Sequence, residues 1–215
     1  MKRSLLICSM IVPAFALSLM GATFPDPPAE QPAAAGVKKA TAVLAGGCFW
    51  GMQGVFEHVK GVTDTTVGYA GGEKKTAAYE RVSTGTTGHA ESIQIVYDPS
   101  VVTYGQLLKI YFAVAHDPTT LNRQHYDEGT QYRSEIFYVD DAQKAEAEKY
   151  IKQLNDAKVF KDPIVTKVEA LKGFYAAEEH HQHYLDRNPT DGYIVAMDLP
   201  LLAHLKSGYP EMYKK

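Results

Sequence analysis

The stretch that most constrains this chain is Gly-Gly-Cys-Phe-Trp-Gly at 46–51, which contains Cys48 and the single tryptophan. A short apolar run at 41–45 precedes it and is typical of a strand, and apolar residues recur at helical spacing after it as far as Val59. The pattern predicts a strand-to-helix turn at Cys48, with glycines that permit a tight backbone and close approach of a ligand. A helix N-terminus favours a thiolate, so we interpret Cys48 as a reactive thiol beside an apolar pocket.

The N-terminal segment has the features of a secretory signal peptide, with positive residues followed by apolar and small ones. We expect a signal peptide at 1–22, a Pro/Ala-rich linker at 23–40 and one folded domain at 41–215. An uncleaved membrane anchor is the second choice, because Pro13 interrupts a stretch that is short for a bilayer span. The only other cysteine, Cys8, lies in the segment that we expect to be removed.

The expected location is an exported, periplasmic one, where an unpaired thiol is a liability unless its reactivity is used. A buried, inert cysteine is the alternative for Cys48, and for a lone cysteine it is the commoner case. The net charge is −3, and lysine and arginine form no stripe along the chain. This charge pattern argues against a nucleic acid or an anionic membrane surface as the partner.

The rest of the chain alternates between strand and helix patterns. Strands are expected at 41–45, 62–69, 91–97, 134–139 and 164–171, and helices at 49–59, 104–115, 140–155 and 176–186. Long polar loops are expected at 71–89 and 119–131, and a tail with one short helix at 199–205. This order predicts an α+β two-layer sandwich with a ferredoxin-like core, a mainly antiparallel sheet, helices on one face and an irregular C-terminal tail.

Three further stretches bear chemistry: Val-Gly-Tyr-Ala-Gly-Gly at 67–72, Thr-Gly-His-Ala-Glu-Ser at 87–92 and Gly-Thr-Gln-Tyr-Arg-Ser at 129–134. Together with 46–51 they closely resemble the peptide methionine sulfoxide reductase A family, over roughly 41–189. Four motifs in the same order make the resemblance specific. It implies a catalytic domain that reduces peptide-bound and free methionine-S-sulfoxide and so repairs oxidised proteins.

The resemblance implies that Cys48 is the nucleophile and becomes a sulfenic acid as methionine is released. Glu91 matches the family's acid, which must be protonated to donate to the sulfoxide oxygen. On the expected strand its same-face neighbours are Ile93 and Ile95, and an apolar setting raises the pKa of a carboxyl group. Without the motif, an exposed charge at a strand end is the simpler interpretation of Glu91.

The resemblance also implies a substrate pocket. Phe49 and Trp50 match the family's methyl-binding aromatic residues, which from sequence alone are equally well explained as core. Tyr79 and Tyr132 match two phenols that hydrogen-bond the sulfoxide oxygen, and Asp127 matches their polar partner. From residue type alone, a lone tyrosine is more often packed for its amphipathic character.

The sequence departs from the family in two places. His125 and Tyr126 stand where many members have glycine and another small residue, and Glu128 replaces a commonly uncharged neighbour, so we expect an altered peptide preference. Many members also place resolving cysteines in the C-terminal tail, and 190–215 contains none. We therefore expect no bound cofactor and regeneration by an external thiol, such as a thioredoxin-like protein, glutaredoxin with glutathione, or dithiothreitol.

The run Glu-Glu-His-His-Gln-His at 178–183 raises the question of a metal site, since His180 and His183 are three residues apart. A solvated surface helix explains this run better, and we expect no metal. We expect a monomer whose partners are oxidised methionine-containing proteins and peptides and a thioredoxin-like reductant.

Two other functions are compatible with a reactive thiol. A peroxidase or thiol transferase would turn over peroxide without selectivity for sulfoxide. A non-catalytic extracytoplasmic binding module would keep its function in a Cys48→Ser variant. The combination of Cys48, Glu91 and two phenols favours the reductase over both.

Overall fold

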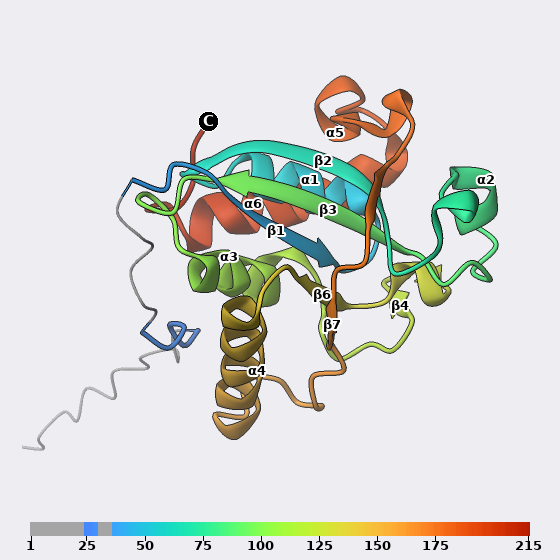
Figure 1. The fold of residues 1–215 in the computed structure, drawn as a ribbon. Helices are drawn as coiled ribbons and strands as arrows, with labels where there is room; N and C mark the ends of the chain where they lie inside the picture. Colours follow the sequence, from blue (N-terminus) through green and yellow to red (C-terminus); the bar gives the residue numbers. More distant parts are fainter. Residues whose placement is uncertain (1–23, 30–35) are drawn as a thin grey trace, which may run out of the picture.

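The computed structural model describes residues 24–29 and 36–215. Its main feature is a six-stranded sheet in the order β7-β6-β1-β3-β2-β8 (Figure 1). The strands are β1 Ala40–Ala45, β2 Val62–Ala70, β3 Ala90–Tyr97, β6 Glu135–Tyr138, β7 Lys167–Ala170 and β8 Phe174–Ala176. Every neighbouring pair is antiparallel except β6 and β7, which are parallel. The α+β class is therefore confirmed, with a mixed sheet.

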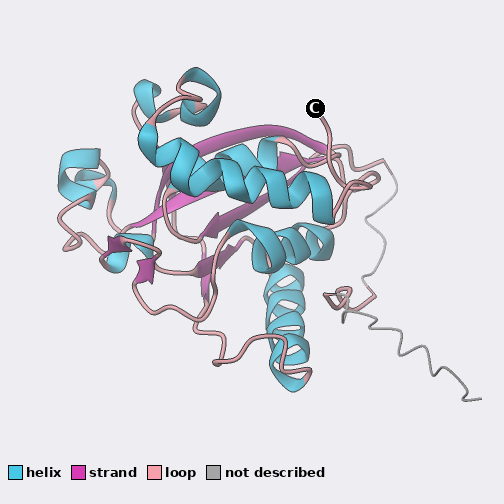
Figure 2. Ribbon diagram, turned by 180° about the vertical axis from the view of Figure 1, so that it is seen from behind, coloured by secondary structure: helices cyan, strands magenta, loops and turns pink. Residues whose placement is uncertain are grey.

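Helices pack on one face of this sheet, and Figure 2 shows α1 and α6 in front of the strands. The α-helices are α1 Phe49–Glu57, α2 Tyr79–Val82, α3 Tyr104–Ile110, α4 Asp141–Asp156, α5 Tyr184–Arg187 and α6 Leu199–Gly208. Short 3-10 turns lie at Lys74–Thr76, Thr130–Tyr132 and Glu179–His181, and π-helical turns at Tyr111–Ala115 and Ile194–Asp198.

Local sequence explains where the longer helices begin. Thr103 caps α3 in a capping box with Gln106, and the side chain of Asp140 accepts from the backbone of Gln143 at the start of α4. The apolar face of α1 then meets the sheet, where Phe56 packs in one buried cluster with Ile95. This core fixes α1 against the strands and so fixes the turn that precedes it.

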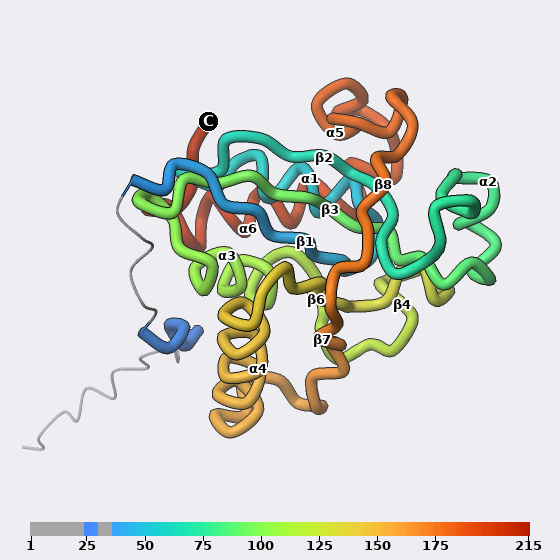
Figure 3. The backbone as a smooth tube through the Cα atoms, in the orientation of Figure 1, coloured from blue at the N-terminus to red at the C-terminus, as the bar shows by residue number. Residues whose placement is uncertain are grey.

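The opposite face of the sheet is covered by extended chain. Figure 3 shows the segment that follows β7 crossing to the edge of β2, where it pairs as β8. Leu171 and Phe174 from this crossing pack on Val43 and Phe137 of the sheet. The expected helix at 176–186 is wrong, because the chain there forms β8, a 3-10 turn and the short α5 instead.

The two expected long loops contain short structure. The first holds the 3-10 turn Lys74–Thr76 and α2, and the second holds a two-stranded ribbon of β4, Arg123–Gln124, and β5, Asp127–Glu128. The tail is more regular than expected, because a π-helical turn and α6 pack against α1.

The proposed signal peptide at 1–22 lies outside the described residues, and the linker at 23–40 lies partly outside them. Where the linker is described, Phe24 contacts Phe160, and the hydroxyl of Tyr150 donates to the Pro25 carbonyl at 2.7 Å. No helix in the described part of the chain is long and apolar enough to cross a bilayer.

Candidate active site

Cys48 lies between β1 and α1, as the sequence predicts. It is the N-cap residue of α1 with an extended backbone, φ −60° and ψ 126°. Gly47 before it has φ +92°, which side-chain-bearing residues rarely adopt, and a Cβ there would lie 2.5 Å from Cγ of Gln124. The glycine is therefore required by both conformation and space, and it aims Cys48 away from the strand.

Glu91 lies at the N-terminus of α1, although it belongs to β3. Its Oε2 accepts a 3.2 Å hydrogen bond from the backbone N–H of Phe49, and the residue is only 2% exposed. Burial raises the pKa of Glu91 to about 8, and the charge of Asp127 adds to this increase. At neutral pH the carboxyl group is therefore predominantly protonated and can act as an acid.

The thiol of Cys48 is not held as a thiolate, in contrast to the expectation from its helix N-terminus. Burial raises the pKa of Cys48 well above 9, and the charges of Glu91, Asp198 and Asp127 raise it further. A hydrogen bond from the backbone of Trp50 works in the opposite direction but is outweighed. Desolvation by burial is the largest cause of this increase, and the nearby carboxyl groups add to it.

Phe49 and Trp50 belong to an aromatic cluster beside the thiol. Phe49 is buried, with its ring centroid 5.3 Å from that of His181. Trp50 is partly exposed and stacks on Tyr184, with centroids 3.8 Å apart and planes inclined by 10°. The ring of Tyr193 meets the edge of Trp50 at 6.1 Å. The cluster forms an apolar wall on which a methyl group can pack.

Tyr79 and Tyr132 both lie close enough to Glu91, Asp127 and Cys48 for the charges of these groups to act on them. Burial raises the pKa of both phenols, and the charges of Glu91, Asp127 and Cys48 raise it further. Both therefore stay protonated and can donate a hydrogen bond at neutral pH.

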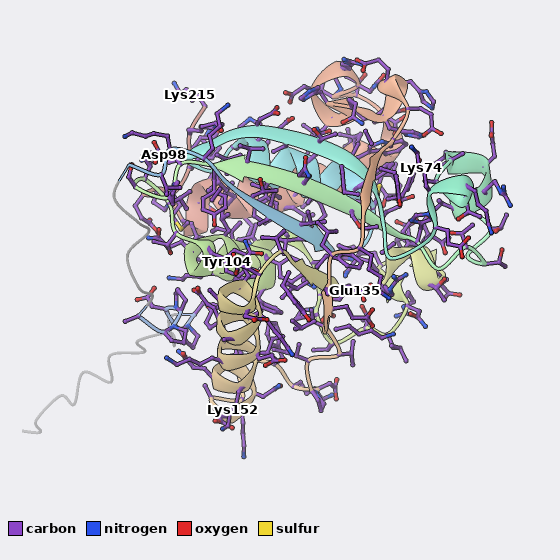
Figure 4. All side chains as sticks on the ribbon, viewed as in Figure 1. Lys74, Asp98, Tyr104, Glu135, Lys152 and Lys215 are labelled. Carbon is purple, nitrogen blue, oxygen red and sulfur yellow. The ribbon has the colours of Figure 1, made fainter. Side chains whose placement is uncertain are left out.

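Separate anchors position the two phenols. The backbone N–H of Tyr79 donates to Oε1 of Glu178 at 2.9 Å, which fixes the start of α2. Arg133, beside Tyr132, donates to the Gly88 carbonyl at 3.0 Å and pairs with Glu135 at 2.6 Å. Glu135 is buried in the interior of the molecule, whereas Lys74 and Lys152 lie at its periphery (Figure 4).

Asp127 lies at the start of β5 and is oriented by a residue from the C-terminal region. The hydroxyl of Tyr193 donates to Oδ2 of Asp127 at 2.5 Å. Asp127 follows a tight turn in which His125 has φ +53° and Tyr126 is 90% exposed. The structure thus brings all seven predicted site residues to one place, and it puts Tyr126 on the open surface next to them.

Part of the site comes from the chain after 176, and the sequence did not predict this contribution. In the run 178–183, expected to be a solvated helix, Glu178 anchors Tyr79 and accepts from Tyr69, and His181 is 3% exposed. Both ring nitrogens of His181 are buried without a hydrogen-bond partner. The only signal in the sequence was the density of polar residues in this run. Tyr193 and Asp198 had no signal at all.

The described residues offer no metal centre, and their chemistry near Cys48 is that of a thiol and an acid. Among the described residues, no group of three or more His, Cys, Asp or Glu side chains is placed to hold a metal ion. Cys48 is the free cysteine of the described chain. The chemistry that these side chains offer is nucleophilic attack by sulfur with proton donation by a carboxylic acid.

Comparison with known proteins assigns this site to a family. The family model for peptide methionine sulfoxide reductase matches residues 40–210. Peptide methionine sulfoxide reductase MsrA 2 of Mesorhizobium japonicum is 59% identical over 175 residues, covering 81% of this chain and 90% of that protein. The MsrA 2 of Synechocystis is 46% identical over 210 residues, covering 96% and 97%.

Solved structures agree with the sequence comparisons. Reduced Mxr1 from Saccharomyces cerevisiae superposes with a TM-score of 0.67 at 39% identity, covering 75% of this chain and 90% of that one. Methionine sulfoxide reductase A of Corynebacterium diphtheriae superposes with a TM-score of 0.62 at 35% identity, covering 80% and 88%. The chain therefore belongs to the peptide methionine sulfoxide reductase family and is a peptide-methionine (S)-S-oxide reductase, an enzyme that reduces methionine sulfoxide.

Proposed function

We propose that Cys48 reduces the sulfoxide by direct attack on its sulfur while Glu91 protonates the oxygen. The observation that carries this proposal is the Phe49 N–H to Glu91 hydrogen bond, because it holds a protonated acid at the helix turn of the thiol. A weakly basic oxygen leaves sulfur only when it is protonated, and this is the role that general acids fill.

Different groups of the site bind the methyl group and the oxygen of the sulfoxide. The wall of Phe49 and Trp50 takes the methyl group, since these rings offer apolar surface in the cluster that includes Cys48. Tyr79 and Tyr132 donate hydrogen bonds to the oxygen, and Asp127 binds on its polar side. The site fixes the position of the methyl group, the position of the oxygen and the direction from which Cys48 attacks the sulfur. Only the S epimer fits all three, which accounts for the selectivity.

The step transfers the sulfoxide oxygen to the sulfur of Cys48. The thiol proton of Cys48 passes to solvent, the thiolate attacks the sulfoxide sulfur, and Glu91 protonates the oxygen, whose bond to the methionine sulfur breaks as its bond to Sγ of Cys48 forms; Glu91 is left ionised until it regains a proton from solvent. The products are methionine and a Cys48 sulfenic acid, so that the sulfoxide sulfur is reduced by two electrons and the thiol sulfur is oxidised by two. Because the free thiol is protonated, we infer that it ionises only once the substrate is bound.

Regeneration requires a thiol from outside the chain. No cysteine follows Cys48 in the sequence, so an internal disulfide cannot form after that point. A thioredoxin-like protein, glutaredoxin with glutathione, or dithiothreitol in vitro reduces the sulfenic acid through a mixed disulfide. The substrates are free and peptide-bound methionine sulfoxide, and the biological role is repair of oxidised proteins by a monomer without a bound cofactor.

We further infer that the protein is exported, with 1–22 as its signal peptide and 23–40 as a linker; a retained membrane anchor is the alternative. The charge pattern and apolar run of the N-terminal residues support export. We also infer a ferredoxin-like core, supported by the central strand order β6-β1-β3-β2 with α1 between β1 and β2. Mass spectrometry of the protein from cell fractions measures the N-terminus and the compartment.

The decisive experiment measures methionine formation from the two separated sulfoxide epimers by wild type and Cys48→Ser. We expect turnover of the S epimer only, none in Cys48→Ser, and a stoichiometric release of methionine without reductant that leaves a trappable sulfenic acid on Cys48. Equal turnover of both epimers, activity in Cys48→Ser, or no trapped Cys48 would contradict the proposal.

A further inference from the structure

A second buried carboxyl group faces the thiol from the C-terminal region. Asp198, the last residue of the π-helical turn before α6, is 3% exposed, and its Oδ2 is buried without a hydrogen-bond partner. An unpaired buried carboxylate is costly, so proteins rarely keep one without a use. Its negative charge raises the pKa of Cys48, which places Asp198 within electrostatic reach of the sulfur.

The chain leaves space for this carboxyl group within the cysteine motif. A Cβ on Gly51 would lie 2.5 Å from Oδ1 of Asp198. Any larger residue at 51, which lies in the first turn of α1, would displace the carboxyl group from its position. The final glycine of Gly-Gly-Cys-Phe-Trp-Gly therefore leaves the space in which the carboxyl group of Asp198 lies near Cys48.

Cys48 and Asp198 line the same small cavity. Its other walls come from Gly46, Gly51, Ala115, Gln124, His125, Tyr193, Met197 and Leu201. Its volume of about 10 Å³ is at the lower limit for holding one water molecule. Glu91, Phe49 and Trp50 do not line it, whereas Tyr193, which donates to Asp127, does. Cys48 and Asp198 therefore share a cavity whose lining does not include Glu91.

We propose that Asp198 is a second acid of the enzyme, which protonates the sulfenic hydroxyl of Cys48 as an external thiolate displaces it. This inference rests on the proposed sulfenic acid intermediate. The hydroxyl occupies the one-water cavity, and the product water forms there. Asp198 lines this cavity and Glu91 does not, so Asp198 is the acid placed to protonate a hydroxyl held there.

The step balances. The thiolate sulfur forms a bond to Sγ of Cys48, the S–O bond breaks, and Asp198 transfers its proton to the departing oxygen to form water. The sulfenic sulfur is reduced and the incoming sulfur oxidised, giving a mixed disulfide that a second thiol opens. Asp198 is left ionised and regains a proton from solvent.

The protonation state of Asp198 suits this role. Burial, together with the charges of Asp127 and Asp191, raises the pKa of Asp198 to about 7. The other titratable groups that face it are Cys48, Tyr193 and His125. Near neutral pH the group both holds and releases a proton, which is the condition under which an acid catalyst is most effective.

The test separates the two half-reactions in one preparation of Asp198→Asn. The first is the release of methionine in the absence of reductant. The second is the loss of trappable sulfenic acid when the oxidised enzyme is mixed with dithiothreitol. We expect release within about threefold of wild type and a second half-reaction slowed about 10²-fold. Asp186→Asn, an exposed carboxyl group on α5, serves as the matched control and leaves both rates unchanged.

The pH profile gives a readout that a structural role would not move. Corrected for the thiolate fraction of dithiothreitol, the wild-type second half-reaction slows above about pH 7, and Asp198→Asn lacks this dependence. An unchanged second half-reaction, or equal slowing of both half-reactions, overturns the proposal. A wild-type enzyme that releases no methionine without reductant contradicts the proposed sulfenic acid instead, so the two failures are distinguishable.

Discussion

The backbone N–H of Phe49 donates a hydrogen bond of 3.2 Å to Oε2 of Glu91. The two residues are 42 positions apart, yet this contact joins the first residue of α1 to the second residue of β3. Because Phe49 directly follows Cys48 in the chain, this contact holds the acid beside the turn that carries the nucleophile. The site is thus organised by backbone elements of the core and does not depend on a mobile loop for its acid.

The Glu91→Gln variant tests the acid. Gln keeps an oxygen that accepts from Phe49 N–H but cannot deliver a proton, so we expect methionine release to slow about 10²-fold. The thermal unfolding of the variant checks that the fold is kept. A variant with more than half of the wild-type rate of methionine release would contradict an acid role for Glu91.

The same variant tests the raised pKa through stability. In the unfolded chain Glu91 ionises near the ordinary pKa of 4.5, whereas burial in the native state raises its pKa to about 8. The native state therefore binds more protons across this window, and the free energy of unfolding falls as pH rises, by roughly 4 kcal/mol from this group. Urea unfolding at pH 4 and pH 8 measures the loss, which we expect to be smaller in Glu91→Gln. An equal loss in both proteins would contradict burial as the cause.

Tyr193→Phe tests the contribution of the C-terminal region to the substrate site. Phe keeps the ring beside Trp50 but removes the hydroxyl that donates to Asp127. A hydrogen bond to a charged group contributes about 1.5–3 kcal/mol, so we expect kcat/KM to fall at least about tenfold. Tyr213→Phe, on a half-buried tyrosine of the C-terminal region that stacks on His58, is the control. Identical kinetics of the two variants would rule out this role for Tyr193.

Gly47→Ala tests the turn before the nucleophile. Gln124, which the new Cβ would meet at 2.5 Å, is held by two hydrogen bonds to the backbone of Asp117 and cannot move freely. Because alanine also disfavours the positive φ of residue 47, we expect the free energy of unfolding of Gly47→Ala to be lower than that of wild type by at least about 2 kcal/mol. Gly192 has open space around it and no positive φ, so the free energy of unfolding of Gly192→Ala should be within about 0.5 kcal/mol of that of wild type. Denaturant unfolding compares the two.

Local patterns predicted much of the fold. The strands at 41–45, 62–69 and 91–97 lie within one residue of β1, β2 and β3. α3 begins at Tyr104 as expected, and the expected helix to 115 continues as a π-helical turn. These elements succeed because side-chain periodicity and capping depend on neighbours within a few residues.

The chain after 176 was predicted poorly for a physical reason. The run 178–183 has the composition of a solvated helix, but its residues are used singly: Glu178 accepts from Tyr69, Gln182 accepts from the backbone of Val67, and His181 packs on Phe49. Contacts over more than 100 positions leave no periodic trace in the sequence.

By itself, the sequence determined the family, through four ordered motifs, and the turn at Cys48, through glycines beside a strand and an apolar helix. Only the tertiary structure decided the protonation of the site. Burial and nearby carboxyl groups raise the pKa of Cys48 and of Glu91, and the fold places Asp198 in the wall of the same cavity as Cys48. A pKa depends on the solvent and charge that surround a group in space, and the chain order of its neighbours does not determine either.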